Sequence, residues 1–137
     1  MCPFVFGLMS KKRWYNLDIE ATGLDPYYSD LILFGISYKD NYFMFDYSID
    51  LKPILEHIIR YNIMIIGHNL KYDISILYAK YNILLTKVYD TMIAEQRLYM
   101  RGGLPNGLKD LIERYTKKVV LKDTRNEFIG VDKNTFK

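Results

Sequence analysis

Two acidic residues, Asp18 and Glu20, stand two positions apart in a segment that otherwise reads as a β-strand. Side chains at positions i and i+2 of a strand point to the same face, so these carboxylates are neighbours that repel each other. Burying the pair without partners would cost on the order of several kcal/mol, or would force one carboxyl to take up a proton. Any fold of this chain must therefore leave the pair at a solvated edge or give it cations.

The residues that follow place this pair at a strand end. The stretch "ATGLDP" is a tight, glycine-containing turn that comes directly after the strand. Ligands gather at the carboxyl ends of strands in open α/β sheets. Two interpretations stay open for the pair itself: hydrated charges where a strand emerges into solvent, or a site for hard cations such as Mg²⁺, which prefer carboxylate oxygens.

The order of the remaining segments predicts the fold class. The chain has 137 residues, half of them hydrophobic, which fits one compact domain with a real core. Strands are expected at 14–19, 30–38, 42–47, 63–67 and near 84–89, and helices at 51–61, 72–80, 91–100 and 108–117. The segment 63–67 is a continuous apolar run, which predicts a strand buried on both faces. This order predicts an α/β fold with a mixed sheet, an antiparallel edge hairpin and flanking helices.

A second polar cluster follows the predicted strand 63–67. His68 and Asn69 come directly after it, and Asp73 falls in the first turn of the next helix. Asp73 has an ordinary explanation as a negative charge that favours a helix N-terminus. If the strand runs parallel to the first one, however, Asp73 faces the same crevice as Asp18 and Glu20. Three carboxylates that converge in this way make a two-metal site for phosphodiester hydrolysis plausible.

These two stretches resemble known motifs. "LDIEATGLDP" and "GHNLKYDISIL" resemble the first and second motifs of the DEDD 3′–5′ exonucleases, above all the proofreading domain of family A (polymerase I-like) DNA polymerases. The later "YDTMIAEQRLY", "GLKDLIERY" and "NTF" follow the usual order of that domain, so the resemblance runs from about Trp14 to the end. It implies a ribonuclease H-like sheet and metal-dependent hydrolysis at the 3′ ends of single-stranded DNA.

The resemblance also implies roles for individual residues. Asp18 would bridge two divalent metal ions, Mg²⁺ or Mn²⁺; Glu20 would ligate one of them, and Asp73 would serve the other, partly through water. The residues expected to meet nucleic acid are Leu24 as a wedge against the terminal bases, the backbone of Ala21, Thr22 and Gly23, and His68, Asn69 and Tyr72 around the groove. Ala21 stands where the family often has threonine, which removes one side-chain contact.

One element of the family pattern is missing. The family has a fourth carboxylate in a third motif, Y-x-x-x-D or H-x-x-x-D, which also positions the attacking water. Asp123 lies eight residues after Tyr115, which is the wrong spacing, and Phe128 before Asp132 lacks a hydroxyl or imidazole. We therefore expect an N-terminal extension over 1–13 and an exonuclease-like domain over 14–137 that is incomplete at its C-terminus.

Several functions remain open at this point. The chain is either a proofreading exonuclease module, a non-catalytic nucleic-acid-binding remnant, half of a split exonuclease or polymerase, or a ribonuclease D-like RNA-trimming enzyme. A second polypeptide with the missing motif and a polymerase domain is a candidate partner. From position 97 onward, ten lysines and arginines stand against five acidic residues, which suits either an anionic nucleic-acid backbone or a solvated surface. The sequence lacks a run of eighteen apolar residues and has a single cysteine, so we expect no membrane span and a cytoplasmic protein, or a viral one acting in the host cytoplasm.

Overall fold

A computed structural model describes residues 13–99 and 102–119 of the chain. Five strands form one sheet in the order β3-β2-β1-β4-β5. Their bounds are β1 Trp14–Ala21, β2 Leu31–Tyr38, β3 Asn41–Asp46, β4 Met64–Gly67 and β5 Val88–Asp90. β1, β2 and β3 pair antiparallel, whereas β1 with β4 and β4 with β5 pair parallel. The predicted α/β fold with a mixed sheet and an antiparallel edge hairpin is thereby confirmed.

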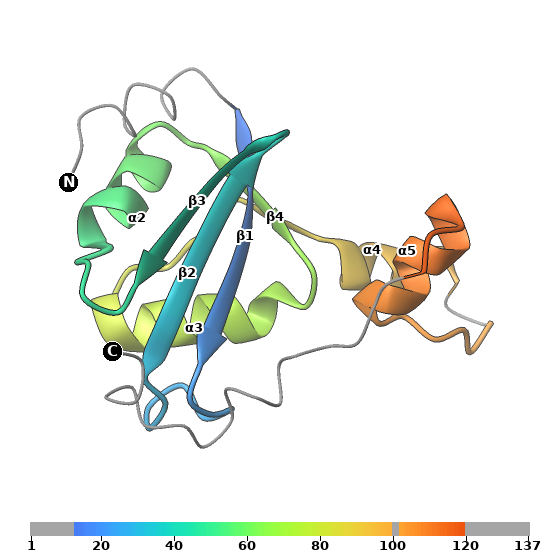
Figure 1. Cartoon of the computed structure of the whole chain (residues 1–137), viewed down its shortest axis with the longest axis horizontal. Coiled ribbons are helices and arrows are strands. Elements are labelled where there is room, and N and C mark those ends of the chain that lie inside the picture. Colours follow the sequence, from blue (N-terminus) through green and yellow to red (C-terminus); the bar gives the residue numbers. More distant parts are fainter. Residues whose placement is uncertain (1–12, 100–101, 120–137) are drawn as a thin grey trace.

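Helices α2 (Lys52–Arg60) and α3 (Leu70–Tyr81) lie on the same face of the sheet (Figure 1). The alternation of β1 fits this arrangement, because Tyr15, Leu17 and Ile19 are buried while Asn16 and Asp18 are exposed. The core is built from this face of the strands and the apolar sides of α2 and α3: Tyr15, Leu17, Ile19, Phe34, Ile36, Ile54, Leu55, Ile58, Ile65, Leu70, Ile76 and Leu77. The acidic pair of β1 consequently projects from the face opposite the core.

Some sequence expectations need correction. The strand expected over 63–67 is β4, but only its Ile65 is fully buried, while Met64 and Ile66 are half-buried. Burial on both faces was wrong because, in the described part of the chain, α2 and α3 cover one face. β1 also runs two residues beyond the expected end at Ile19, since pairing with β2 continues through an irregularity between Glu20 and Ala21.

Two further helices, α4 (Thr91–Leu98) and α5 (Leu108–Thr116), stand beside the sheet (Figure 1). Glu95 of α4 is buried and pairs with Arg114 of α5. Tyr115 donates a hydrogen bond to Glu95 Oε2 at 2.8 Å. This hydrogen bond is the main cause that raises the pKa of Tyr115 to about 12. The network joins α4 to α5.

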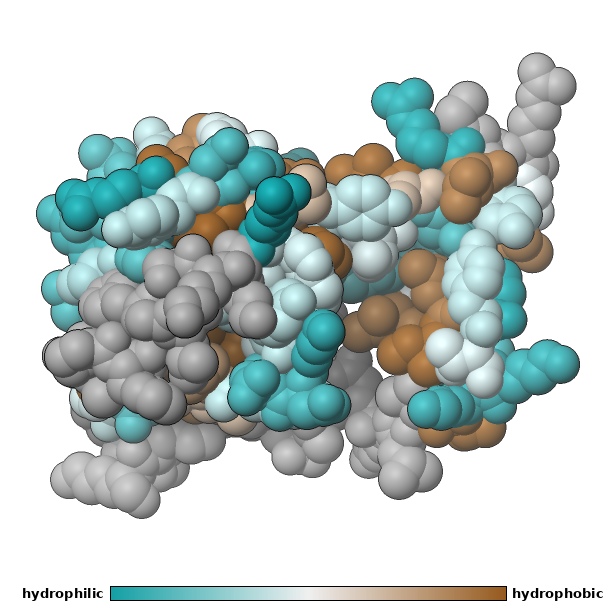
Figure 2. All heavy atoms as spheres, turned by 90° about the horizontal axis from the view of Figure 1, so that it is seen from above, coloured by the Kyte–Doolittle hydropathy of each residue, from teal (hydrophilic) through white to brown (hydrophobic). Residues whose placement is uncertain are grey.

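The surface of this helical pair carries apolar side chains. Ile93, Leu98, Leu104 and Leu108 are each close to half exposed or more, and Figure 2 shows apolar surface gathered over this part of the molecule. None of the helices in the described ranges is long and apolar enough to span a bilayer. The domain boundary expected at position 13 stays a prediction, because residues 1–12 lie outside the described ranges.

Candidate active site

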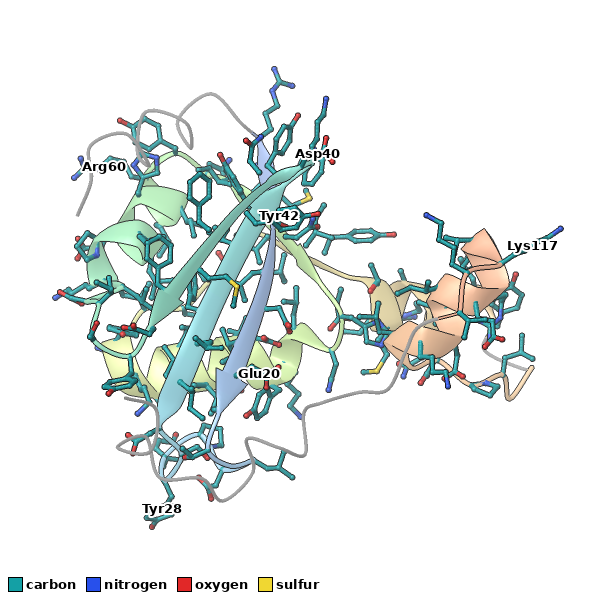
Figure 3. All side chains as sticks on the ribbon, viewed as in Figure 1. Glu20, Tyr28, Asp40, Tyr42, Arg60 and Lys117 are labelled. Atoms are coloured by element: carbon teal, nitrogen blue, oxygen red, sulfur yellow. The ribbon has the colours of Figure 1, made fainter. Side chains whose placement is uncertain are left out.

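Asp18 and Glu20 lie near the carboxyl end of β1, on the face of the sheet opposite α2 and α3 (Figure 1). Asp18 is exposed and Glu20 is half-buried. In the antiparallel pairing, Asp18 stands opposite Gly35 of β2 and Glu20 opposite Leu33. Directly opposed residues project to the same face, so the missing side chain of Gly35 leaves space beside Asp18. Figure 3 shows Glu20 near the end of β1 that leads into the turn.

Asp73 lies beside the same stretch of β1, and the different lengths of the strands explain how. β4 pairs with β1 only as far as Asn16 and Ile66, then ends at Gly67. The first turn of α3 follows, beside the part of β1 that β4 leaves unpaired. There Asp73 Oδ1 accepts a hydrogen bond from Ile19 N at 3.0 Å. Asp73 is only 4% exposed. A buried carboxylate needs such donors, because an unpartnered one is strongly disfavoured.

The three carboxylates therefore lie at one end of the sheet, Asp18 and Glu20 on β1 and Asp73 on α3, which follows the parallel strand β4. The N–H that Asp73 binds belongs to the peptide that links Asp18 to Ile19. Even so, the described ranges hold no group of three acidic, histidine or cysteine side chains placed to share a metal ion. The expected convergence on one point is thus corrected: Asp73 binds the β1 backbone, whereas Asp18 and Glu20 project from the open face. Their roles as metal ligands stay predictions.

Gly67 fixes the path of the chain from β4 into α3. A Cβ at this position would lie 2.9 Å from Leu17 O and would collide with Leu70 Cδ2. Both contacts are shorter than real Cβ atoms show, and the first involves backbone that cannot move aside. Only glycine allows β4 to end so close to β1, and this closeness lets Asp73 reach the edge of β1.

The turn after β1 contacts α3 directly. Tyr72 donates a hydrogen bond from its hydroxyl to Gly23 O at 2.7 Å. Thr22 Oγ1 accepts a hydrogen bond from Asp30 N at 2.8 Å. The side chain of Ala21 is buried, while that of Leu24 is 72% exposed. Of the residues expected to meet nucleic acid, Tyr72, Gly23 and Thr22 thus hold the turn together, and Leu24 projects outward.

Known proteins were compared with this chain. The sequence pattern of the 3′–5′ exonuclease family matches residues 10–128. The chain belongs to the 3′–5′ exonucleases of the DEDD type. Among proteins with curated descriptions, none matches the sequence.

Solved structures agree with this exonuclease assignment at the level of the fold. An apo nuclease superposes with a TM-score of 0.78 at 20% identity, over 96% of this chain and 64% of its own. NrnC of Brucella melitensis bound to pGG gives 0.73 at 21% identity, over 90% and 62%. RNase D of Escherichia coli gives 0.70 at 17% identity, over 93% and 37%. The exonuclease chain thus spans less than two thirds of the length of these proteins.

Sequence reasoning missed much of what Asp90 does in the exonuclease domain. Asp90 caps α4, accepting hydrogen bonds from Met92 N and Ile93 N. It also accepts hydrogen bonds from Asn69 N at 3.0 Å and Leu70 N at 2.8 Å, at the start of α3. An aspartate before a helical pattern signals one N-cap. The second helix could not be inferred, because it depends on β5 lying beside β4.

His68 and Asn69 lie at this same junction. The Thr91 hydroxyl donates to Gly67 O at 3.1 Å and lies 2.9 Å from His68 Nδ1. Since the Thr91 proton is used, its oxygen accepts from His68 Nδ1–H. Asn69 is the exposed N-cap of α3, with φ of 59°. Both residues are thus placed at the start of α3, and their contact with nucleic acid stays a prediction.

Replacing Tyr72 with phenylalanine tests the link between α3 and the turn. Loss of the hydrogen bond to Gly23 O should cost about 0.5–1.5 kcal/mol. The effect should be local, so amide hydrogen exchange over residues 22–30 should accelerate by about five- to tenfold. Tyr78→Phe, on the exposed side of the same helix, is the control. Unchanged exchange in the turn of Tyr72→Phe would contradict this role.

Proposed function

We propose that this chain is the catalytic part of a metal-dependent 3′–5′ exonuclease that removes nucleotides from the 3′ ends of single-stranded DNA, as the proofreading module of a DNA polymerase. One observation carries the proposal: Asp73 binds the peptide between Asp18 and Ile19. That contact joins the two motifs that resemble the exonuclease signature at one end of the sheet. Asp18 is exposed, Glu20 is half-buried and Asp73 is buried, and all three carboxylates lie at that end of the sheet.

The donor set suits hard divalent cations. Asp18 and Glu20 carry carboxylate oxygens on the face opposite α2 and α3 (Figure 1), with Asp73 at the same end of the sheet, and such oxygens suit Mg²⁺ or Mn²⁺. These residues would hold two ions. Bound ions of this kind activate a water molecule and stabilise the leaving oxygen of a phosphodiester. A solved structure of Brucella melitensis NrnC contains bound Mg²⁺.

The protein groups around the carboxylates would orient the 3′ end. Leu24 is exposed at the turn and would wedge against the terminal base. The backbone from Ala21 to Gly23 is fixed by Tyr72 and by Asp30, so the terminal nucleotide would meet a preformed surface. Groups that are held in place before binding lose less entropy in the transition state.

The fourth carboxylate and the group that orients water belong to a third motif. Asp123 and Asp132, the acidic candidates in the last segment, lie outside the described residues. We propose that a segment with Y-x-x-x-D, in the same polypeptide or in a partner that carries the polymerase domain, completes the site. The proposed place of action is the cytoplasm.

RNA is the second candidate substrate. E. coli RNase D is described as an exoribonuclease involved in structured RNA processing, and one NrnC structure contains pGG. These similar proteins favour trimming of structured RNA as the alternative. The contacts that separate a ribose from a deoxyribose lie at a 2′-hydroxyl.

A laddering assay decides between these functions. The chain is incubated, alone and together with a segment that carries Y-x-x-x-D, with 5′-labelled DNA or with RNA of the same sequence. Mg²⁺ or Mn²⁺ is present at about 5 mM. We expect little hydrolysis by the chain alone and stepwise 3′–5′ shortening of DNA by the completed enzyme. Faster shortening of RNA would replace the proofreading role by the RNA-trimming one. Hydrolysis that EDTA leaves unchanged would contradict the proposal.

A further inference from the structure

The turn between β1 and β2 exposes two adjacent aromatic side chains. Tyr27 is 81% exposed and Tyr28 is 89% exposed. Together with Leu24, three large side chains project from five consecutive positions of one turn. Figure 3 shows Tyr28 projecting from the end of the sheet to which β1 carries Glu20. A single exposed tyrosine is ordinary, but this group stands at the end of the sheet that carries the candidate active site.

Hydrogen bonds within the turn hold its backbone in one shape. Thr22 N donates to Asp30 O at 2.9 Å, and Ser29 N donates to Asp25 O at 2.9 Å. Asp25 Oδ1 accepts from Tyr27 N at 2.9 Å. Because the backbone beneath these rings is already ordered, it would lose little conformational entropy when a ligand binds to them.

The turn is also tied to α3, the helix that supplies Asp73. Tyr72 binds Gly23 O, and Lys80 forms an ion pair with Asp30 at 3.3 Å. Lys71, in the first turn of α3, is exposed. The turn that carries the aromatic pair is thus held against the helix that supplies Asp73, and exposed lysines lie on this helix, which suits a ligand with flat bases and a charged backbone.

We propose that Tyr27 and Tyr28 form a stacking platform for bases of the single strand whose 3′ end occupies the active site. This inference rests on the proposed function and assigns a substrate-binding surface to residues outside the carboxylate site. Stacking of bases on aromatic rings is tolerant of sequence, because every base presents a π-face. An enzyme that shortens a strand one nucleotide at a time needs such tolerance, since each cycle brings a different base to the same position.

The test compares two double variants of the full chain with a distant control. In Tyr27→Ala/Tyr28→Ala both rings are removed, whereas Tyr27→Phe/Tyr28→Phe retains them without hydroxyls. Tyr42→Ala removes an exposed tyrosine from β3, and Figure 3 shows Tyr42 toward the other end of the sheet from Tyr28. Binding of a 5′-fluorescein-labelled oligothymidylate is measured by fluorescence anisotropy in EDTA, so that hydrolysis cannot interfere. Circular dichroism checks that each variant is folded.

We expect the double alanine variant to bind about ten- to a hundredfold more weakly, because stacking contributes strongly for each base. The double phenylalanine variant and Tyr42→Ala should bind within about twofold of the unaltered chain. An oligonucleotide with abasic sites near its 3′ end should bind the unaltered chain weakly. Its affinity for the double alanine variant should be only slightly lower.

Each other outcome overturns the platform in a recognisable way. Unchanged affinity of the double alanine variant overturns it while the proposed exonuclease function stands. A phenylalanine variant as weak as the alanine variant shows that the hydroxyls, and not stacking, bind the strand. If the double alanine variant differs from the unaltered chain in self-association but not in DNA affinity, the two tyrosines form a protein–protein interface and not a stacking platform. If the unaltered chain binds no single strand, both the platform and the proposed function fail.

Discussion

Asp18→Ala is expected to leave the metal-free protein as stable as the unaltered chain, yet to abolish its response to divalent ions. Asp18 is exposed, and the contacts of an exposed charge contribute little to stability, so folding loses little. Millimolar Mn²⁺ should raise the melting temperature of the unaltered chain by several degrees, since an ion that binds only the native state stabilises it by mass action. Asp18→Ala should lose most of that rise. In the completed enzyme, strand shortening should fall about a thousandfold or more, which corresponds to roughly 4 kcal/mol.

Asp73→Ala provides the matched contrast. Asp73 is buried and accepts the hydrogen bond of Ile19 N, so its removal leaves that N–H without its partner. The metal-free variant should therefore lose about 1–3 kcal/mol of unfolding free energy, which Asp18→Ala should not. Melting temperatures are measured with and without Mn²⁺ for both variants. Equal metal-free stabilities of the two would show that Asp73 has no structural role, and an unaltered chain indifferent to Mn²⁺ would refute the metal site.

Asp90→Ala is expected to be among the most destabilising substitutions of a partly exposed residue in this chain. Its carboxylate accepts hydrogen bonds from backbone N–H groups at the starts of both α3 and α4. Loss of one N-cap costs about 0.5–2 kcal/mol, so loss of both should cost about 1–4 kcal/mol. Chemical denaturation measures the change. Because α3 carries Asp73 and Tyr72, the variant should also weaken metal binding without touching a ligand.

Two further variants give this prediction its controls. Asp90→Asn keeps one acceptor oxygen and should lose about half as much as alanine. Asp110→Ala, which removes the acceptor of one hydrogen bond, from Gly107 N at the start of α5, should cost only about 0.5–1 kcal/mol. A similar loss for Asp90→Ala and Asp110→Ala would show that the second helix gains nothing from Asp90.

What the sequence by itself determined was the type and order of most elements and the identity of the acidic residues. Alternation along β1 and helical periodicity in α2, α3 and α5 are local signals, because side-chain direction follows from backbone geometry alone. They predicted the mixed sheet, and the motifs around Asp18 and Asp73 together predicted the family. Asp73 was placed in the first turn of its helix for the same local reason.

What only the tertiary structure decided was how these elements meet. The sequence could not show that β4 ends before β1 does, and this difference in length lets Asp73 bind the backbone of β1. Nor could it show that Asp90 accepts hydrogen bonds from the starts of both α3 and α4. It also could not show that α2 and α3 lie on one face of the sheet (Figure 1) and leave β4 half-buried. Each of these depends on distances between segments far apart in the chain, which pairing and packing fix and local periodicity does not contain.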